Sequence, residues 1–333
     1  MSNCIFLLIL NVKGFLPSFC NNIMAEAGVL CHITSLPSGK LGPDAFTFVD
    51  ILAETGVSVW KILPITPPDE NHNPHFSTSA FAGSVKLCDP SFEEDPDHQL
   101  IRDWLSVNAH WAWDWALYDV LKQLHDERPW YEWPQPLRER EPGAIQAAIE
   151  QYMPIMRGRI MNQVRFQRDW MILRHYATQN GIQLCGQVPI SIAKDSVDVW
   201  VRPHLFRKDI DHEDVTNELI SHHWSAHQDD GWTWWQMRMS RASGLFDFVE
   251  LTGSWSGGHK QECLTSIAEV VGENQIIDSE SSLSVSVPLQ NIVYSDAMID
   301  YNQANSQFWE WKFEWPLLAK GNWDAFNRRV SQG

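Results

Sequence analysis

The sequence has few basic residues for its size. It contains 25 Lys and Arg against 42 Asp and Glu in 333 residues, a formal net charge of −17. Such a charge repels nucleic-acid phosphates and anionic lipid, so we expect neither a nucleic-acid partner nor a membrane surface. No apolar run approaches the roughly 20 residues that cross a bilayer. A neutral ligand suits this chain better.

Closely paired cysteines are also missing. The cysteines are scattered along the chain: Cys4, Cys20, Cys31, Cys88, Cys185 and Cys263. Without a C-x-x-C pair, neither a disulfide framework nor a zinc site is expected, and the pattern favours a reducing, cytoplasmic compartment. His72 and His75 have a spacing that metal ligands use, but two histidines alone do not make a site. We therefore expect no metal and no cofactor.

The first 23 residues differ from the organised chain that follows them. Their apolar run, residues 5–10, is short and has no basic residue before it, so a secretory signal is not expected. Met24 offers a second start besides Met1. We expect residues 1–23 to be either a tail or a start-site artefact, and residues 24–333 to form one domain.

From residue 28 onward, short β-branched apolar runs alternate with longer helical ones, which is typical of β-α units around a parallel sheet. Strands are predicted over residues 28–32, 57–63, 183–188, 245–251, 274–278 and 291–295. Helices are predicted over 44–54 and 166–179, each followed by a glycine stop signal. Residues 90–161 carry no strand signal, and their Trp, Leu and Ala at helical spacing predict a helical insert beside the active-site mouth.

Several long segments resemble the 4-α-glucanotransferase, or amylomaltase, family. They include GVLCHITSLPSG (28–39), VWKILPI (59–65), STSAFAG (77–83), GQVPISIAKDSVDVW (186–200) and GWTWWQMRMSRASGLFDFVEL (231–251). The resemblance implies a TIM-type (β/α)8 barrel that passes α-1,4-glucan chains to another sugar with retention of configuration. That chemistry uses two carboxyl groups about 5 to 5.5 Å apart at the carboxyl ends of the strands. The shortened end leaves open whether the barrel is complete.

The family's catalytic positions are altered in this chain. The nucleophilic aspartate falls on Thr252, the acid/base glutamate on Ser279, and the third carboxylate one residue before Asp300. A hydroxyl offers no negative charge to an oxocarbenium-like centre, so the sequence predicts impaired or lost catalysis. The alternative is an active enzyme that uses misaligned carboxylates, namely Asp247, Asp278 or Asp300.

The resemblance also implies positions that contact a maltodextrin substrate: His32, Pro74, His75, Ser79, Gln187 and Asp195. Two of them are changed, since His75 replaces a tyrosine and Gln187 an aspartate of the family pattern. Asp195 and Asp198 are either structural caps or glucan contacts. Strand edges left open by an incomplete barrel would need cover from a homodimer or a protein partner.

Other residues have a purely structural interpretation. Trp111, Trp113 and Trp115 lie at helical spacing and are expected to pack rather than to stack on sugar. The adjacent histidines His222 and His223 are expected to lie in a solvated loop. Glu250, at the family's arginine position, is expected to be a solvated carboxylate.

Overall fold

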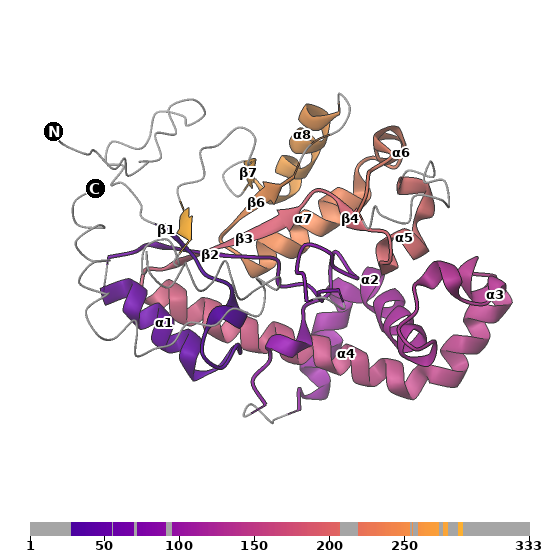
Figure 1. Ribbon diagram of the computed structural model, residues 1–333, viewed down its shortest axis with the longest axis horizontal. Coiled ribbons are helices and arrows are strands. Elements are labelled where there is room, and N and C mark those ends of the chain that lie inside the picture. The colour runs from indigo at the N-terminus through magenta and orange to yellow at the C-terminus, as the bar shows by residue number, and fades with distance from the viewer. Residues whose placement is uncertain are drawn as a thin grey trace, which may run out of the picture.

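A parallel sheet forms the centre of the computed structural model, which describes residues 28–54, 56–69, 72–90, 95–206, 219–253, 255, 259–272, 276–278 and 286–288. In this part of the chain the sheet has six strands in the order β7-β6-β3-β2-β1-β8 (Figure 1). Their bounds are β1 (Gly28–Leu30), β2 (Val59–Ile62), β3 (Gln183–Pro189), β6 (Phe248–Thr252), β7 (Ile276–Asp278) and β8 (Ser286–Pro288). Five of the six predicted strands are therefore confirmed with shifted ends, and the sixth, 291–295, lies outside the described residues.

The strand order is that of a TIM-like barrel. β1, β2, β3, β6 and β7 neighbour one another in chain order, and β8 pairs in parallel with β1. A singly wound barrel has this arrangement, with its last strand beside its first. Among the described residues no pairing joins β7 to β8, so the sheet shows the barrel order without its closure. A small antiparallel pair, β4 (Ile192–Ala193) with β5 (Leu219–Ile220), follows the carboxyl end of β3.

The two faces of the sheet carry different side chains because neighbouring strand residues point in opposite directions. One face is apolar and covered by helices, and its fully buried residues include Trp60, Leu184 and Leu251. On this face Trp60 meets Phe48 edge-on, with ring centroids 4.9 Å apart. The other face carries polar residues.

The covering helices connect successive strands. They are α1 (Pro43–Glu54), α2 (His98–Leu124), α3 (Gln135–Arg138), α4 (Pro142–Gln179), α5 (Val197–Val201), α6 (Trp224–Asp229), α7 (Thr233–Leu245) and α8 (Lys260–Val271). In Figure 1, α1 and α4 run below the strands, whereas α8 stands above them. α1 starts at a proline and confirms the helix predicted over 44–54.

The block predicted as a helical insert is helical, but α4 continues through residue 161 and reaches the start of β3. The last part of the insert, residues 142–161, and the helix predicted over 166–179 thus belong to one helix, which packs along α2. Asp97 caps α2 by accepting from the Leu100 backbone N–H at 2.7 Å. Trp111 and Trp115 are buried, so their expected packing role is confirmed.

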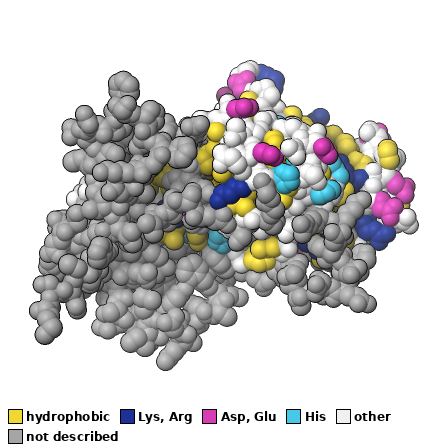
Figure 2. All heavy atoms as spheres, turned by 90° about the horizontal axis from the view of Figure 1, so that it is seen from above, with side chains coloured by type: hydrophobic (Ala, Val, Ile, Leu, Met, Phe, Trp, Pro, Cys, Tyr) yellow, Lys and Arg dark blue, Asp and Glu magenta, His cyan; other side chains and the backbone are white. Residues whose placement is uncertain are grey.

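Three general features of the described residues complete the fold. Four cysteines, at 31, 88, 185 and 263, are free thiols. Within the same residues, no helix combines the length and apolar character needed to span a membrane. On the face seen in Figure 2, the described Lys and Arg side chains are scattered rather than gathered into one basic patch.

Candidate functional site at the carboxyl ends of the strands

An ion pair joins two strands on the polar face of the sheet. Lys61 Nζ of β2 lies 2.6 Å from Glu250 Oε2 of β6, and Gln187 Nε2 of β3 donates to the same oxygen at 3.1 Å. Gln187 stands between them because its register partner on β6 is Glu250. The side chains of Lys61 and Glu250 are 8% and 4% exposed. A buried charge needs a partner of this kind to offset the loss of water.

The expectation of a solvated Glu250 is therefore wrong. Its position in mid-strand directs the side chain toward β3 and β2, where Lys61 neutralises it. Thr252 is two residues further on β6 and belongs to the same face, since side chains repeat every second residue in a strand. The position expected for the nucleophile thus carries a hydroxyl close to a carboxylate that is already engaged.

The other candidate carboxylates lie at different positions relative to the sheet. Asp247 precedes β6 at its amino end, where it accepts from the Leu184 N–H at 2.7 Å and pairs with Arg174 at 3.0 Å. Barrel enzymes place their chemistry at the carboxyl ends, so the position of Asp247 argues against its use as a substitute nucleophile. Asp278 ends β7. Its register partner on β6 is Leu251, which lies between Glu250 and Thr252 in the chain. Ser279 and Asp300 lie outside the described residues.

A small cavity of about 50 Å³ opens beside the carboxyl ends of β2 and β3. His75, Ser79 and Gln187, three of the expected substrate contacts, contribute to its wall, together with Arg238 and Arg241 of α7. Ser79 is 1% exposed, and its Oγ accepts from the backbone N–H groups of residues 81 and 82. Ser79 therefore shapes the loop that forms the wall.

Two histidines stand near one another at the ends of β1 and β2. His32 follows β1 and is buried, and its Nδ1 has no hydrogen-bond partner among the described residues. Burial, assisted by the charge of His75, lowers the pKa of His32 to about 4. Burial also lowers the pKa of His75, which follows Pro74 in a turn where Asn73 Oδ1 accepts from the His75 N–H at 3.0 Å. Both rings are therefore neutral near pH 7 and suited to hydrogen bonding with sugar hydroxyls.

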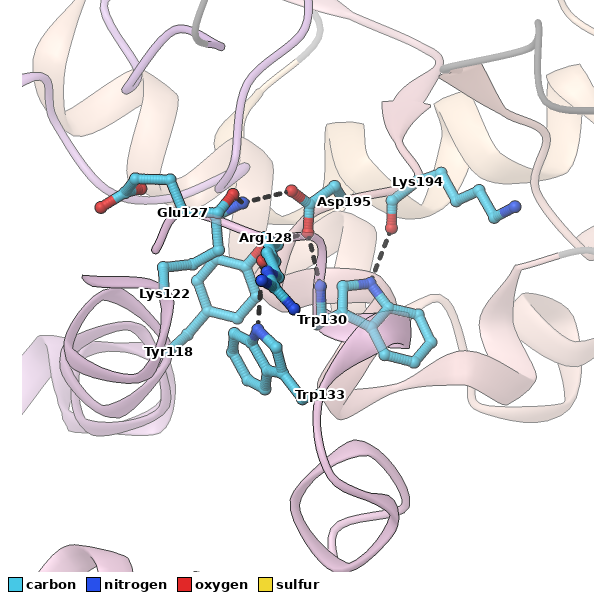
Figure 3. Close-up of polar contacts among 8 residues, drawn as sticks. All are labelled: Tyr118, Lys122, Glu127, Arg128, Trp130, Trp133, Lys194 and Asp195. Atoms are coloured by element: carbon cyan, nitrogen blue, oxygen red, sulfur yellow. Dashed lines mark hydrogen bonds and ion pairs between the residues drawn. The ribbon is translucent and has the colours of Figure 1, made fainter. Parts of the chain in front are cut away.

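Asp195 holds the helical insert to the strand end (Figure 3). Its Oδ1 accepts from Tyr118 Oη at 2.7 Å and from the Trp130 N–H at 3.0 Å, and its Oδ2 accepts from Lys122 Nζ at 2.6 Å. Trp130 Nε1 donates in turn to the carbonyl oxygen of Lys194 at 2.8 Å. Protein groups thus occupy both oxygens of Asp195.

Asp198 is also engaged by the protein. It is 2% exposed and accepts from the Ala80 N–H at 2.7 Å and from Trp234 Nε1 at 3.0 Å. Of the two readings left open for these aspartates, the geometry favours the structural one. Asp195 anchors the insert, and Asp198 connects α5 to the loop after β2 and to α7.

Several buried polar residues were not predicted. The sequence signal for Lys61 is a lysine that interrupts an apolar strand. The sequence signal for Arg238 and Arg241 is their position on one side of a helix rich in Trp. The expectation of a solvated loop at 222–223 is wrong for His222, which is 2% exposed and stacks on Trp224 with ring centroids 4.7 Å apart. Adjacent histidines suggest exposure, but the surrounding tryptophans bury this one.

The profile of the family described as 4-alpha-glucanotransferase matches residues 31–99 and 86–251. The 4-alpha-glucanotransferase of Aquifex aeolicus is 30% identical over 286 residues, covering 68% of this chain and 59% of that protein. The Streptococcus pneumoniae enzyme is 26% identical over 76% of this chain and 66% of its own length. The structure resembles an amylomaltase from Streptococcus agalactiae, solved with acarbose, with a TM-score of 0.68 and 23% identity over 78% of this chain and 70% of that one.

These comparisons first define a class: the protein has a TIM-barrel-like α/β fold. The chain belongs to the 4-alpha-glucanotransferase family. It spans about 59 to 66% of the length of the two curated relatives named above.

Proposed function

We propose that this protein binds α-1,4-glucans at the carboxyl ends of its strands and that its transglycosylation activity is lost or strongly impaired. One observation carries the proposal: β6 ends in Thr252, next to a Glu250 carboxylate that is tied to Lys61. The Thr252 hydroxyl cannot replace a carboxylate nucleophile, and Glu250 is held by Lys61 and Gln187.

A retaining transferase forms a covalent glycosyl intermediate on one carboxylate and protonates the leaving oxygen with a second carboxyl group. Removal of a nucleophile typically lowers the turnover number by several orders of magnitude, leaving what binding and orientation supply. Loss of catalysis does not require loss of binding, because the groups that line the cavity are separate from Thr252.

The glucan-contacting groups of this proposal are His32, Pro74, His75 and Gln187. Neutral imidazoles and an amide offer both donors and acceptors to sugar hydroxyls. Ser79 and Asp195 act indirectly, by holding the loop after β2 and the helical insert. We further propose that the protein works in a reducing, cytoplasmic setting in which its free thiols persist.

Two assays on the purified full chain test the proposal. Incubation with maltotriose is expected to release neither glucose nor longer maltodextrins, whereas isothermal titration with maltoheptaose is expected to show binding. Disproportionation at ordinary enzyme rates, about 1 to 10³ per second, would refute the loss of catalysis. Absence of heat with maltoheptaose would refute glucan binding.

Variants localise the binding. His75→Ala and Gln187→Ala are each expected to weaken maltoheptaose binding about 5- to 10-fold, equivalent to one or two hydrogen bonds. His175→Ala is the matched control, because His175 is exposed on α4, away from the strand ends. Equal affinities in all three variants would place the glucan elsewhere.

The alternative function is that of an active transferase, and the position of β7 supports it. This strand neighbours β6 and ends at Asp278, so the backbone of an aspartate lies at the carboxyl end of the sheet. In that case Asp278→Asn or Asp300→Asn abolishes the disproportionation of maltotriose. If catalysis is impaired as proposed, the unmodified protein does not disproportionate maltotriose at ordinary enzyme rates.

A further inference from the structure

Two arginines of α7 enter the interior beside the cavity at the ends of β2 and β3. Arg238 and Arg241 are three residues apart and therefore share one side of the helix. Arg238 is 5% exposed, and both arginines belong to the cavity wall. The wall thus contains two positive charges close to one another.

No carboxylate of the described chain neutralises these charges through an ion pair. Asp198 is the acid whose charge acts on Arg238, but its oxygens accept from Ala80 and Trp234 instead. Within the described residues, Arg238 Nε, Arg238 Nη1 and Arg241 Nη2 are buried without a hydrogen-bond partner. A buried, unpaired donor of a charged group is costly, so the structure predicts that something else accepts from these nitrogens.

The groups that do contact the arginines leave these donors unsatisfied. The Arg238 guanidinium lies over the rings of Trp234 and Trp235, with centroid distances of 5.1 and 5.2 Å. Arg241 lies over Trp111 at 5.5 Å, and it also donates to Gln167 Oε1 and to the Phe81 carbonyl oxygen. Aromatic faces attract a cation but do not accept its in-plane N–H groups.

The charge state of both arginines is positive near neutral pH. Burial lowers the pKa of each to about 10, with the charge of Asp198 acting in the opposite direction on Arg238. The other titratable group in the wall is His75, whose burial favours the neutral ring. Nothing described in the wall therefore cancels the two charges.

We propose that the cavity beside Arg238 and Arg241 binds a small inorganic anion of the size of chloride. Its volume of about 50 Å³ exceeds the roughly 10 to 15 Å³ that one water requires, and falls far below the 300 Å³ or more typical of sites for larger organic ligands. An anion there accepts from the unpartnered guanidinium nitrogens and joins α7 to the ends of β2 and β3. The anion site shares its wall with His75 and Gln187, two of the proposed glucan contacts, so its occupancy is measured in the absence of glucan.

The experiment compares thermal unfolding of the full chain in sodium chloride, sodium bromide and sodium gluconate at constant ionic strength. Gluconate serves as an anion too large for the cavity. Chloride and bromide are expected to raise Tm by about 2 to 4 °C with saturation, because a ligand that binds the folded state stabilises it by mass action. Equal Tm values in all three salts, or a rise that does not saturate, would overturn the proposal.

Chloride-35 NMR relaxation supplies a direct readout that does not depend on unfolding. The wild-type protein is expected to broaden the chloride line, and bromide is expected to displace that effect. Arg241→Gln is expected to lose the broadening and the saturable Tm response. Arg159→Gln is the matched control, since Arg159 is a partly exposed arginine of α4 paired with Asp119, and it is expected to keep both. Broadening that is unchanged in Arg241→Gln would also overturn the proposal, and would assign the chloride to another place.

Discussion

Lys61 and Glu250 form a buried ion pair, with 2.6 Å between Nζ and Oε2, across the polar face of the sheet. The pair links β2 to β6 over the intervening β3, whose Gln187 donates to the same carboxylate. It lies next to Thr252, at the level of the sheet where the family's chemistry is expected. The ion pair joins the strands, and it also keeps the Glu250 carboxylate engaged rather than free.

Breaking this pair from one side is expected to destabilise the protein strongly. Lys61→Met leaves Glu250 buried with its amide partner alone, and removal of one member of a buried pair costs about 3 to 5 kcal/mol. The double change Lys61→Met with Glu250→Gln removes both charges and is expected to recover much of the loss. Urea unfolding of the three proteins measures these free energies. A single variant as stable as the wild type would show that the pair contributes little.

The strands and helices could be predicted because each leaves a local signal. Pro43 marks the start of α1, and short β-branched apolar runs mark the strands even where their ends shift by a few residues. The continuity of α4 was missed, since Pro154 and the polar residues around it interrupt the apolar pattern without breaking the helix. The tertiary packing along α2 supplies what the local pattern lacks.

The site was less predictable because its contacts join residues far apart in the chain. The family resemblance predicts Thr252 at the nucleophile position, but the sequence could not show that Lys61 engages Glu250, because that contact depends on strand register. It left Asp195 open between two roles, and the choice required the position of Tyr118 and Lys122 on α2. Arg238 and Arg241 read as ordinary helix residues until burial and the missing acceptors were known.

The second prediction concerns Asp195, which holds the helical insert to the strand end. Asp195→Asn keeps the size of the side chain but replaces an oxygen that accepts from Lys122, Tyr118 or Trp130 with an amide that donates. The loss is expected to be about 2 kcal/mol, since hydrogen bonds to a charged group contribute more than neutral ones. Thermal unfolding measures it. Asp114→Asn, which breaks a more exposed pair with Arg140, is the control and is expected to lose less than 1 kcal/mol.

Close packing behind the sheet provides a third prediction. A Cβ atom added at Gly186 of β3 would lie 2.3 Å from the Phe246 ring, so Gly186→Ala requires that buried ring to move. We expect a loss of about 1 to 3 kcal/mol, as for other overpacked cores. Gly158→Ala on α4 meets nothing within 4 Å and is expected to stabilise by up to about 1 kcal/mol through helix propensity. Chemical denaturation of both variants checks the opposite signs, and a neutral Gly186→Ala would contradict the packing.

The last prediction concerns acid pH and the pair formed by His222 and His227. His222 Nε2 lies 2.7 Å from the Ile190 carbonyl oxygen, which can accept but not donate, so this nitrogen carries the proton in the neutral pair. His222 Nδ1 then accepts from His227 Nε2 at 2.8 Å. Burial lowers the pKa of His222 well below its ordinary value and that of His227 to about 4.

Because each of these histidines has a lower pKa in the folded chain than in the unfolded one, the unfolded chain binds more protons between about pH 6.5 and pH 4. Stability is therefore full above pH 6.5 and falls as the pH is lowered through that window, by on the order of 3 kcal/mol for His227. His227→Gln removes this titration and is expected to flatten the dependence relative to wild type. Exposed His98 is the control, and His98→Gln is expected to leave the slope unchanged, as measured by urea unfolding at pH 7.5, 6, 5 and 4. Equal slopes for wild type and His227→Gln would show that His227 does not take up its proton on unfolding.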